Sequence, residues 1–114
     1  MKLSETYLKA ADVIRTNGHY KGSYYGVGES GVGIQLTPAE SPVCAVGALS
    51  IAVDGQPVPC SDEVDVIALD FAQHLRLPMP DSWPTIAISE WNDEFDRTPG
   101  DVIAAFEQAA RKVA

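Results

Sequence analysis

Residues 42–53 restrict the possible folds more than any other part of the chain. They read PVCAVGALSIAV and are almost wholly apolar, so a helix built from them has no polar face. Such a helix has to lie at the centre of the fold, packed on several sides. We predict that it starts at Ser41-Pro42, with proline at the first helical position, and ends at Asp54-Gly55. A buried strand is the alternative, but the alanine content and the length of the segment favour a helix.

Other segments carry the patterns of amphipathic helices that could cover this central element. Apolar residues at helical spacing predict helices over residues 4–17, 62–76 and 83–93, and a last one that follows Thr98. A chain of 114 residues has room for one domain. We therefore predict a single domain, residues 1–114, of mainly α class. It is compact and has about five helices, with a minor β hairpin or glycine-rich loop near residues 20–37.

Two helix starts have recognisable caps. Ser4 is the predicted N-cap of the first helix. Thr98 is the predicted N-cap of the last helix, with Pro99 at its first position and Asp101 completing a pattern close to a capping box.

The glycine-rich stretch contains a pattern that resembles a dinucleotide-binding loop. Gly26, Gly28 and Gly31 spell G-x-G-x-x-G. In a dinucleotide site a buried strand leads into the glycines and a helix follows them. Here no apolar strand precedes them, and Pro38 follows too soon for a long helix. We therefore predict no nucleotide cofactor, and interpret the glycines as positions of positive φ in turns, with a hairpin turning near residues 28–31.

The charge and its layout exclude several kinds of partner. The net charge is −8, and no Lys or Arg lies between Lys21 and Arg76. A field of this sign repels phosphate backbones and anionic membranes, so we predict neither direct nucleic-acid binding nor membrane docking. One interpretation is the acidic surface of a soluble protein; the other is an acidic patch that binds a basic partner, or even mimics nucleic acid.

The N-terminus has no apolar region of the secretory kind, and no apolar run is long enough to span a membrane. We therefore expect a cytoplasmic protein, in the host cytoplasm if a phage encodes it. Its two cysteines, Cys44 and Cys60, are expected to be free thiols.

Cys44 is the strongest candidate for chemistry. It lies near the predicted start of the central helix, where a helix N-terminus can lower the pKa of a thiol. With His19 or His74 as a base and Asn92 or Asp93 as an orienting group, a Cys-dependent hydrolase or transferase can be drawn. Its apolar neighbours favour the alternative of an inert core thiol. The spacing of cysteines and histidines fits no metal site, so we predict neither metal nor cofactor.

Aromatic and polar residues supply the candidate binding positions. Trp91-Asn92-Asp93 is either a polar recognition site beside an aromatic ring, or a core Trp followed by turn-forming residues. Tyr24 and Tyr25 either offer a binding surface beside the glycine loop or pack across the hairpin.

Several of these segments together resemble a known family. Cys-Ala-Val-Gly-Ala-Leu at residues 44–49, Trp-Asn-Asp at residues 91–93 and Arg-Thr-Pro at residues 97–99 are similar to boxes of a family of small proteins of unknown function from actinobacteria and their phages. The resemblance covers most of the chain, implies no activity or cofactor, and implies a phage setting. The leading hypothesis is thus a small acidic, non-enzymatic module that binds an unidentified protein, such as a host factor. The chain itself is expected to be a monomer or a homodimer.

Overall fold

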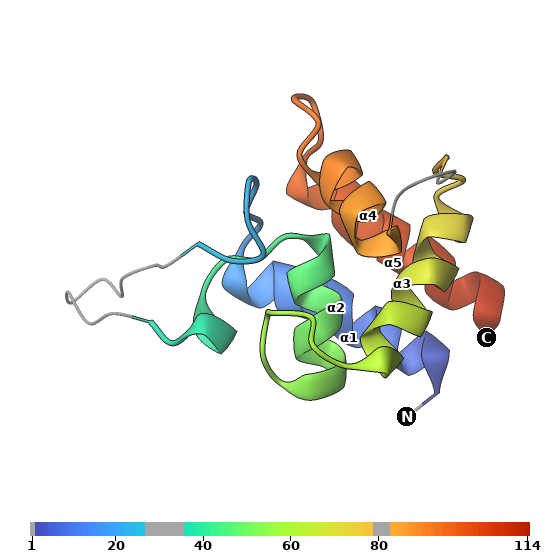
Figure 1. Ribbon diagram of the computed structural model, residues 1–114, viewed down its shortest axis with the longest axis horizontal. Coiled ribbons are helices and arrows are strands. Elements are labelled where there is room, and N and C mark those ends of the chain that lie inside the picture. The colour runs from blue at the N-terminus through green and yellow to red at the C-terminus, as the bar shows by residue number, and fades with distance from the viewer. Residues whose placement is uncertain (1, 27–35, 79–82) are drawn as a thin grey trace.

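The computed structural model describes residues 2–26, 36–78 and 83–114. Within them the chain forms a mainly α fold of five α-helices and one short 3-10 turn (Figure 1). In chain order these are α1 (Leu3–Asn17), η1 (Pro38–Glu40), α2 (Ala45–Asp54), α3 (Asp62–His74), α4 (Pro84–Asn92) and α5 (Pro99–Val113). The prediction of about five helices is confirmed. None of these helices is long and apolar enough to cross a membrane.

The apolar segment forms the central helix, as predicted. From Ala45 to Ser50 every residue of α2 is buried, and α1, α3 and α4 pack against it (Figure 1). Its predicted start was wrong, because α2 begins at Ala45 with Cys44 as its N-cap. Pro42 and Val43 remain extended because their backbone groups bond to residues 18–26: the Val43 N–H donates to the Gly18 carbonyl, and the Gly26 N–H donates to the Pro42 carbonyl.

A cluster of aromatic rings joins α1, α3 and α5. Phe71 of α3 stacks on Phe106 of α5 with ring centroids 4.6 Å apart, and Tyr7 of α1 lies against both rings. Trp91 of α4 meets the edge of Phe71 at 6.1 Å. Rings in these offset and edge-on arrangements add stability beyond the area that they bury. Trp91 is therefore anchored in the core, which fixes the direction in which α4 ends.

Of the two predicted helix N-caps, Thr98 is confirmed and Ser4 is wrong. Thr98 and Asp101 form the expected capping box: Thr98 Oγ1 accepts from the Asp101 N–H at 3.1 Å, and an Asp101 carboxylate oxygen accepts from the Thr98 N–H at 2.9 Å. Ser4 does not cap α1. The helix starts one residue earlier with Lys2 as N-cap and without a side-chain cap bond, so Ser4 lies inside the first turn.

The described part of the predicted hairpin pairs with another segment. His19 and Tyr25 both form isolated bridges with Val43, which precedes α2 in the chain. They do not pair with each other. The minor hairpin is thus not confirmed, and its predicted turn at residues 28–31 lies outside the described residues.

Gly26 has a different role from the positive-φ turn that we predicted. It is not among the glycines with positive φ, and a Cβ atom placed on it would come within 2.2 Å of the Tyr20 ring. The absence of a side chain at Gly26 therefore makes room for Tyr20.

Candidate functional site

The segment that follows the core anchor Trp91 changes from buried to exposed within four residues. Asn92 is 0% exposed, whereas Asp93, Glu94, Phe95 and Asp96 are all exposed. The first two residues of the Trp91-Asn92-Asp93 motif are therefore internal, and the third begins a turn on the surface.

Asn92 connects three parts of the chain through its side-chain amide. Its Oδ1 accepts from the backbone N–H of Ala45 at 2.9 Å and lies 2.7 Å from His19 Nε2. Its Nδ2 donates to the Tyr20 carbonyl and to Asp93 Oδ1, both at 3.0 Å. Because a backbone N–H can only donate, the atom facing Ala45 has to be the amide oxygen. It follows that His19 Nε2 carries the proton in this contact.

Cys44 lies beside this network as a buried thiol. It is 2% exposed, and its Sγ accepts from the Gly47 N–H at 3.4 Å. Burial raises the pKa of the Cys44 thiol to about 11, and the nearby negative charge of Asp93 adds to the effect. A helix N-terminus normally lowers a thiol pKa, but here desolvation is the larger influence.

The two histidines considered as bases for Cys44 have other contacts. His19 is bound to Asn92 through Nε2. His74 lies at the end of α3, with Nε2 3.1 Å from Asp70 Oδ2 and its ring edge-on to Tyr7. No hydrogen bond joins either imidazole to Cys44 Sγ among the described residues, so the geometry shows no activated nucleophile.

Phe95 is the most exposed large apolar residue that the structure describes. It is 100% exposed and belongs to the turn formed by residues 93–97, which projects beyond α4 (Figure 1). Lys21 holds the backbone of this turn from one side: its Nζ donates to the Glu94 carbonyl at 2.6 Å and lies 3.3 Å from the Phe95 carbonyl. Asp93 Oδ1 also accepts from the Gly22 N–H at 3.0 Å.

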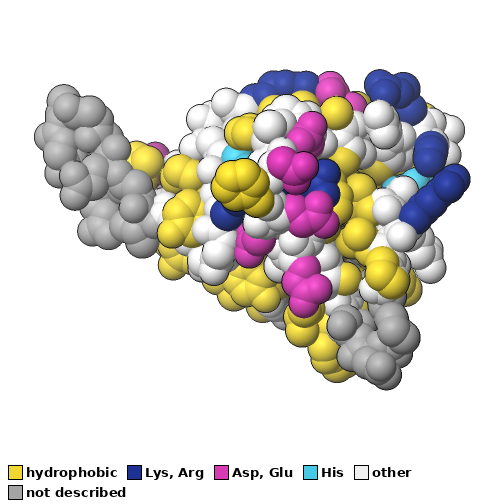
Figure 2. Space-filling model, turned by 90° about the horizontal axis from the view of Figure 1, so that it is seen from above, with side chains coloured by type: hydrophobic (Ala, Val, Ile, Leu, Met, Phe, Trp, Pro, Cys, Tyr) yellow, Lys and Arg dark blue, Asp and Glu magenta, His cyan; other side chains and the backbone are white. Residues whose placement is uncertain are grey.

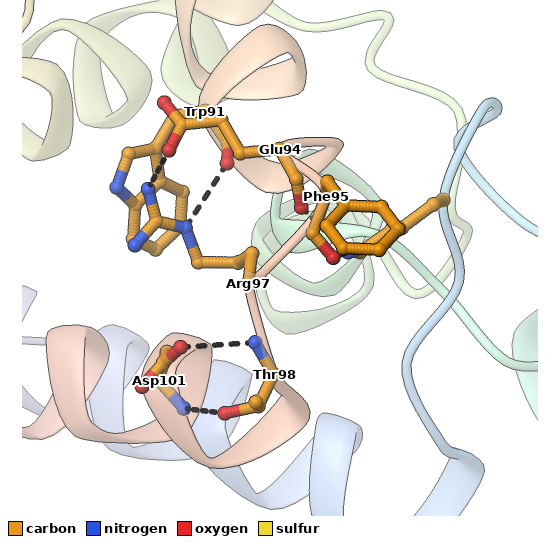
Figure 3. A network of polar contacts seen from close by, with 7 residues as sticks. Trp91, Glu94, Phe95, Arg97, Thr98 and Asp101 are labelled. Carbon is orange, nitrogen blue, oxygen red and sulfur yellow. Dashed lines mark hydrogen bonds and ion pairs between the residues drawn. The ribbon is translucent and has the colours of Figure 1, made fainter.

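Arg97 holds the turn from the other side. Its guanidinium carbon lies 4.2 Å from the centroid of the Trp91 ring, at a distance typical of a cation–π contact (Figure 3). Its Nε donates to the Trp91 carbonyl at 3.1 Å, and its Nη2 donates to a Glu94 carboxylate oxygen at 2.7 Å. Phe95 points away from this arrangement (Figure 3). The turn is thus fixed at both ends while its apolar side chain stays in water.

Acidic side chains lie close to Phe95 in the chain. Glu90, Asp93, Glu94 and Asp96 are exposed on the end of α4 and on the turn. Figure 2 looks down on this side of the molecule and shows Asp and Glu side chains gathered near its middle, next to exposed hydrophobic ones. This surface combines one exposed aromatic ring with four acidic side chains, of which Glu94 is paired with Arg97.

The sequence analysis missed Phe95. The signal was a lone aromatic residue between acids, in the short Glu-Phe-Asp stretch that separates the end of one helix from the Thr-Pro-Gly start of the next. Phe95 follows Ile88 by seven residues and Trp91 by four, which is helical spacing, so periodicity alone would place it with the core residues. The structure leaves it outside because α4 ends at Asn92.

A cleft of about 340 Å³ opens on the same side of α4. It lies between residues 22–24 and α4, and it is lined by Gly22, Ser23, Tyr24, Cys44, Ile86, Ser89, Glu90 and Asp93. Three of the candidate binding residues, Tyr24, Cys44 and Asp93, meet here. Trp91 and Asn92 lie in the core behind it, and Tyr25 pairs with Val43 instead. Within the described ranges, no group of three His, Cys, Asp or Glu residues could hold a metal ion.

Comparison with known proteins places the chain by its sequence. A family model described as "Family of unknown function (DUF6197)" matches residues 1–112. No curated protein and no solved structure matches the chain.

Proposed function

The chain belongs to DUF6197, a family of unknown function, and we propose from the geometry of its own residues that it is a non-enzymatic protein-interaction module. Its contact residue is Phe95, which inserts into an apolar pocket of a partner protein. The observation that carries the proposal is a ring that is 100% exposed on a turn held at both ends.

Immobilisation of the turn supports binding more than exposure alone does. A flexible loop loses conformational freedom when it binds, and that loss weakens affinity. The contacts of Lys21 and Arg97 with the backbone of residues 91–95 remove much of this freedom before any partner arrives. Residues that dominate the binding energy of interfaces are enriched in large anchors that fill pockets, as Phe95 would.

The charges around Phe95 indicate the chemistry of the partner. Asp93, Glu94 and Asp96 flank the ring, so a pocket edged by Lys or Arg side chains is electrostatically complementary. The whole chain carries a net charge of −8, which accelerates encounter with a basic surface. The resemblance to phage proteins directs the search to a host protein with such a pocket.

The two other hypotheses receive less support. A nucleophile at Cys44 needs a thiolate, and a thiol with a pKa of about 11 is almost wholly protonated at neutral pH. A nucleic-acid mimic would present carboxylates alone to a phosphate-binding surface, whereas here an apolar ring stands among them. An aromatic anchor in an acidic surround suits a protein pocket better.

The test compares three immobilised proteins: the unchanged chain, Phe95→Ala and Val66→Ala. Val66 is an exposed apolar residue of α3, away from the turn, and it controls for non-specific hydrophobic capture. Each is exposed to lysate of the cell that encodes the protein, and the retained proteins are quantified by mass spectrometry. We expect at least one partner to be retained by the unchanged chain and by Val66→Ala but lost by Phe95→Ala.

The purified partner then allows the affinity to be measured by calorimetry. Phe95→Ala should weaken it by about 30-fold or more, the size expected for an interface hot spot. The same substitution should change the free energy of unfolding by less than about 0.5 kcal/mol, because the ring makes no buried contact. Identical sets of retained proteins for all three baits would contradict the proposal.

A further inference from the structure

The cleft beside α4 has a wall fixed by close backbone packing. A Cβ atom on Gly47 would lie only 2.3 Å from the Tyr24 carbonyl oxygen, so glycine at this position lets residues 22–24 approach the first turn of α2. The Cys44 N–H donates to the same carbonyl at 3.1 Å. Tyr24 is therefore held in place opposite α4, and the cleft between them is preformed.

The lining of the cleft combines apolar and acidic side chains. Ile86 and Tyr24 supply apolar surface, while Glu90 and Asp93 supply carboxylates at the C-terminal end of α4. Glu90 and Asp93 are three residues apart, a spacing that places side chains next to each other on a helix surface. The C-terminal end of a helix carries partial negative charge, which adds to the field of the two carboxylates.

Neither carboxylate is matched by a basic side chain within the described ranges. The hydrogen bonds of Asp93 to Gly22 and Asn92 both use Oδ1, and no bond of Oδ2 or of the Glu90 carboxylate involves a described residue. Lys21 and Arg97, the basic residues that hold the turn, bind Glu94 and backbone carbonyls instead.

We infer that this cleft binds an arginine side chain of the partner protein. The inference rests on the proposed function, since the arginine would belong to the protein that receives Phe95. The hydrocarbon stem would pack against Ile86, and the planar guanidinium would lie near the Tyr24 ring and bond to Glu90 and Asp93.

The size and chemistry of the cleft favour arginine over other ligands. A volume of about 340 Å³ is at the small end of ligand sites, which suits one side chain. A guanidinium presents several N–H donors in one plane and can bridge two carboxylates, whereas an ammonium group acts as a point charge. Anionic ligands are disfavoured by the same carboxylates.

The test uses a minimal probe, so that it does not depend on finding the partner. The ¹⁵N-labelled chain is titrated with N-acetyl-arginine amide and its amide signals are followed by NMR at low salt. We expect saturable shifts at Gly22, Ser23 and Ser89, with a dissociation constant on the order of millimolar. N-acetyl-citrulline amide, which has the same shape without the charge, should bind at least about 10-fold more weakly.

Two variants separate this inference from the proposed function. Glu90→Gln should weaken arginine binding by about fivefold or more and leave the fold unchanged, because Glu90 is exposed. Phe95→Ala should leave arginine binding unchanged while it abolishes capture of the partner. Absence of saturable shifts, equal binding of citrulline, or tighter binding of N-acetyl-lysine amide would each overturn the assignment to arginine, whatever the outcome with Phe95.

Discussion

Asn92 and Phe95 are three residues apart and reverse the usual distribution of polar and apolar side chains. The amide of Asn92 is 0% exposed and the phenyl ring of Phe95 is 100% exposed. The buried amide is stable because its oxygen and nitrogen are both hydrogen-bonded, to partners on two distant segments, residues 19–20 and Ala45. The exposed ring gains nothing from folding. The comparison teaches that Asn92 serves the fold and Phe95 serves contact with another molecule.

The largest expected effect is on the free energy of unfolding, and it tests the buried amide of Asn92. Asn92→Ala should lower the free energy of unfolding by about 3 kcal/mol, because it leaves the Ala45 N–H and the Tyr20 carbonyl without a partner inside the protein. Unfolding in urea, followed by circular dichroism, measures the change.

Asn17→Ala is the matched control for this substitution. Asn17 also donates to two backbone carbonyls, those of Ala39 and Ser41, but it lies nearer the surface, where water can replace it. We expect a cost of only about 1 kcal/mol. Equal costs for the two asparagines would contradict the role of Asn92 as a buried connection.

The second prediction compares the reactivity of two thiols, one buried beside Asn92 and one on the surface. Cys44 lies beside Asn92, is buried, and has a pKa raised to about 11, whereas Cys60 is exposed. At pH 8 only about 0.1% of Cys44 would be thiolate, the form that reacts. We expect iodoacetamide to modify Cys60 at least on the order of 100-fold faster, as mass spectrometry of the native protein would show.

The same pKa fixes how Cys44 contributes to stability as the pH changes. Because the folded-state pKa lies above that of an exposed thiol, the protonated form is favoured in the fold. The contribution of Cys44 is therefore complete at neutral pH and is lost as the pH rises toward 11. Modification of Cys44 at the rate of Cys60 in the native protein would show that the thiol is accessible and would reopen the hydrolase or transferase hypothesis.

The smallest of the three effects concerns Arg97, which holds the turn that carries Phe95. Arg97→Ala should lower the free energy of unfolding by about 1 kcal/mol, since it removes the contact with the Trp91 ring and the bond to the Trp91 carbonyl. Arg15→Ala is the control: Arg15 also forms ion pairs, with Asp12 and Glu107, but these are more exposed and should contribute less to stability than Arg97 does.

Hydrogen exchange gives this third prediction a local measurement. The amide of Arg97, which donates to the Glu94 carbonyl, should exchange faster in Arg97→Lys than in the unchanged chain, because an ammonium group cannot both stack on the ring and bond as the guanidinium does. Unchanged exchange would mean that Lys21 and Asp93 hold the turn without Arg97.

Much of the fold could be predicted because its signals are local. The central position of α2 follows from an apolar run, and the start of α5 follows from Thr98 and Asp101, which contact each other three residues apart. Helix periodicity and capping boxes depend on residues within about one turn, so a linear sequence displays them directly.

The errors at helix starts have a tertiary cause. Ser41-Pro42 has the composition of a helix start, yet the backbone of residues 42–43 pairs with residues 18–26, and the helix begins only at Ala45. Pairing between segments this far apart in the chain leaves no signature near residue 42.

By itself, the sequence determined the helical class, the central element and the net negative charge of this protein, since these depend on composition and on residues close together in the chain. Only the tertiary structure decided that Asn92 is internal and Phe95 external. The partners of Asn92 lie 47, 72 and 73 residues away. Whether an amide finds such partners, or a ring finds a core, depends on how the helices pack, and that is decided by the sum of many distant contacts.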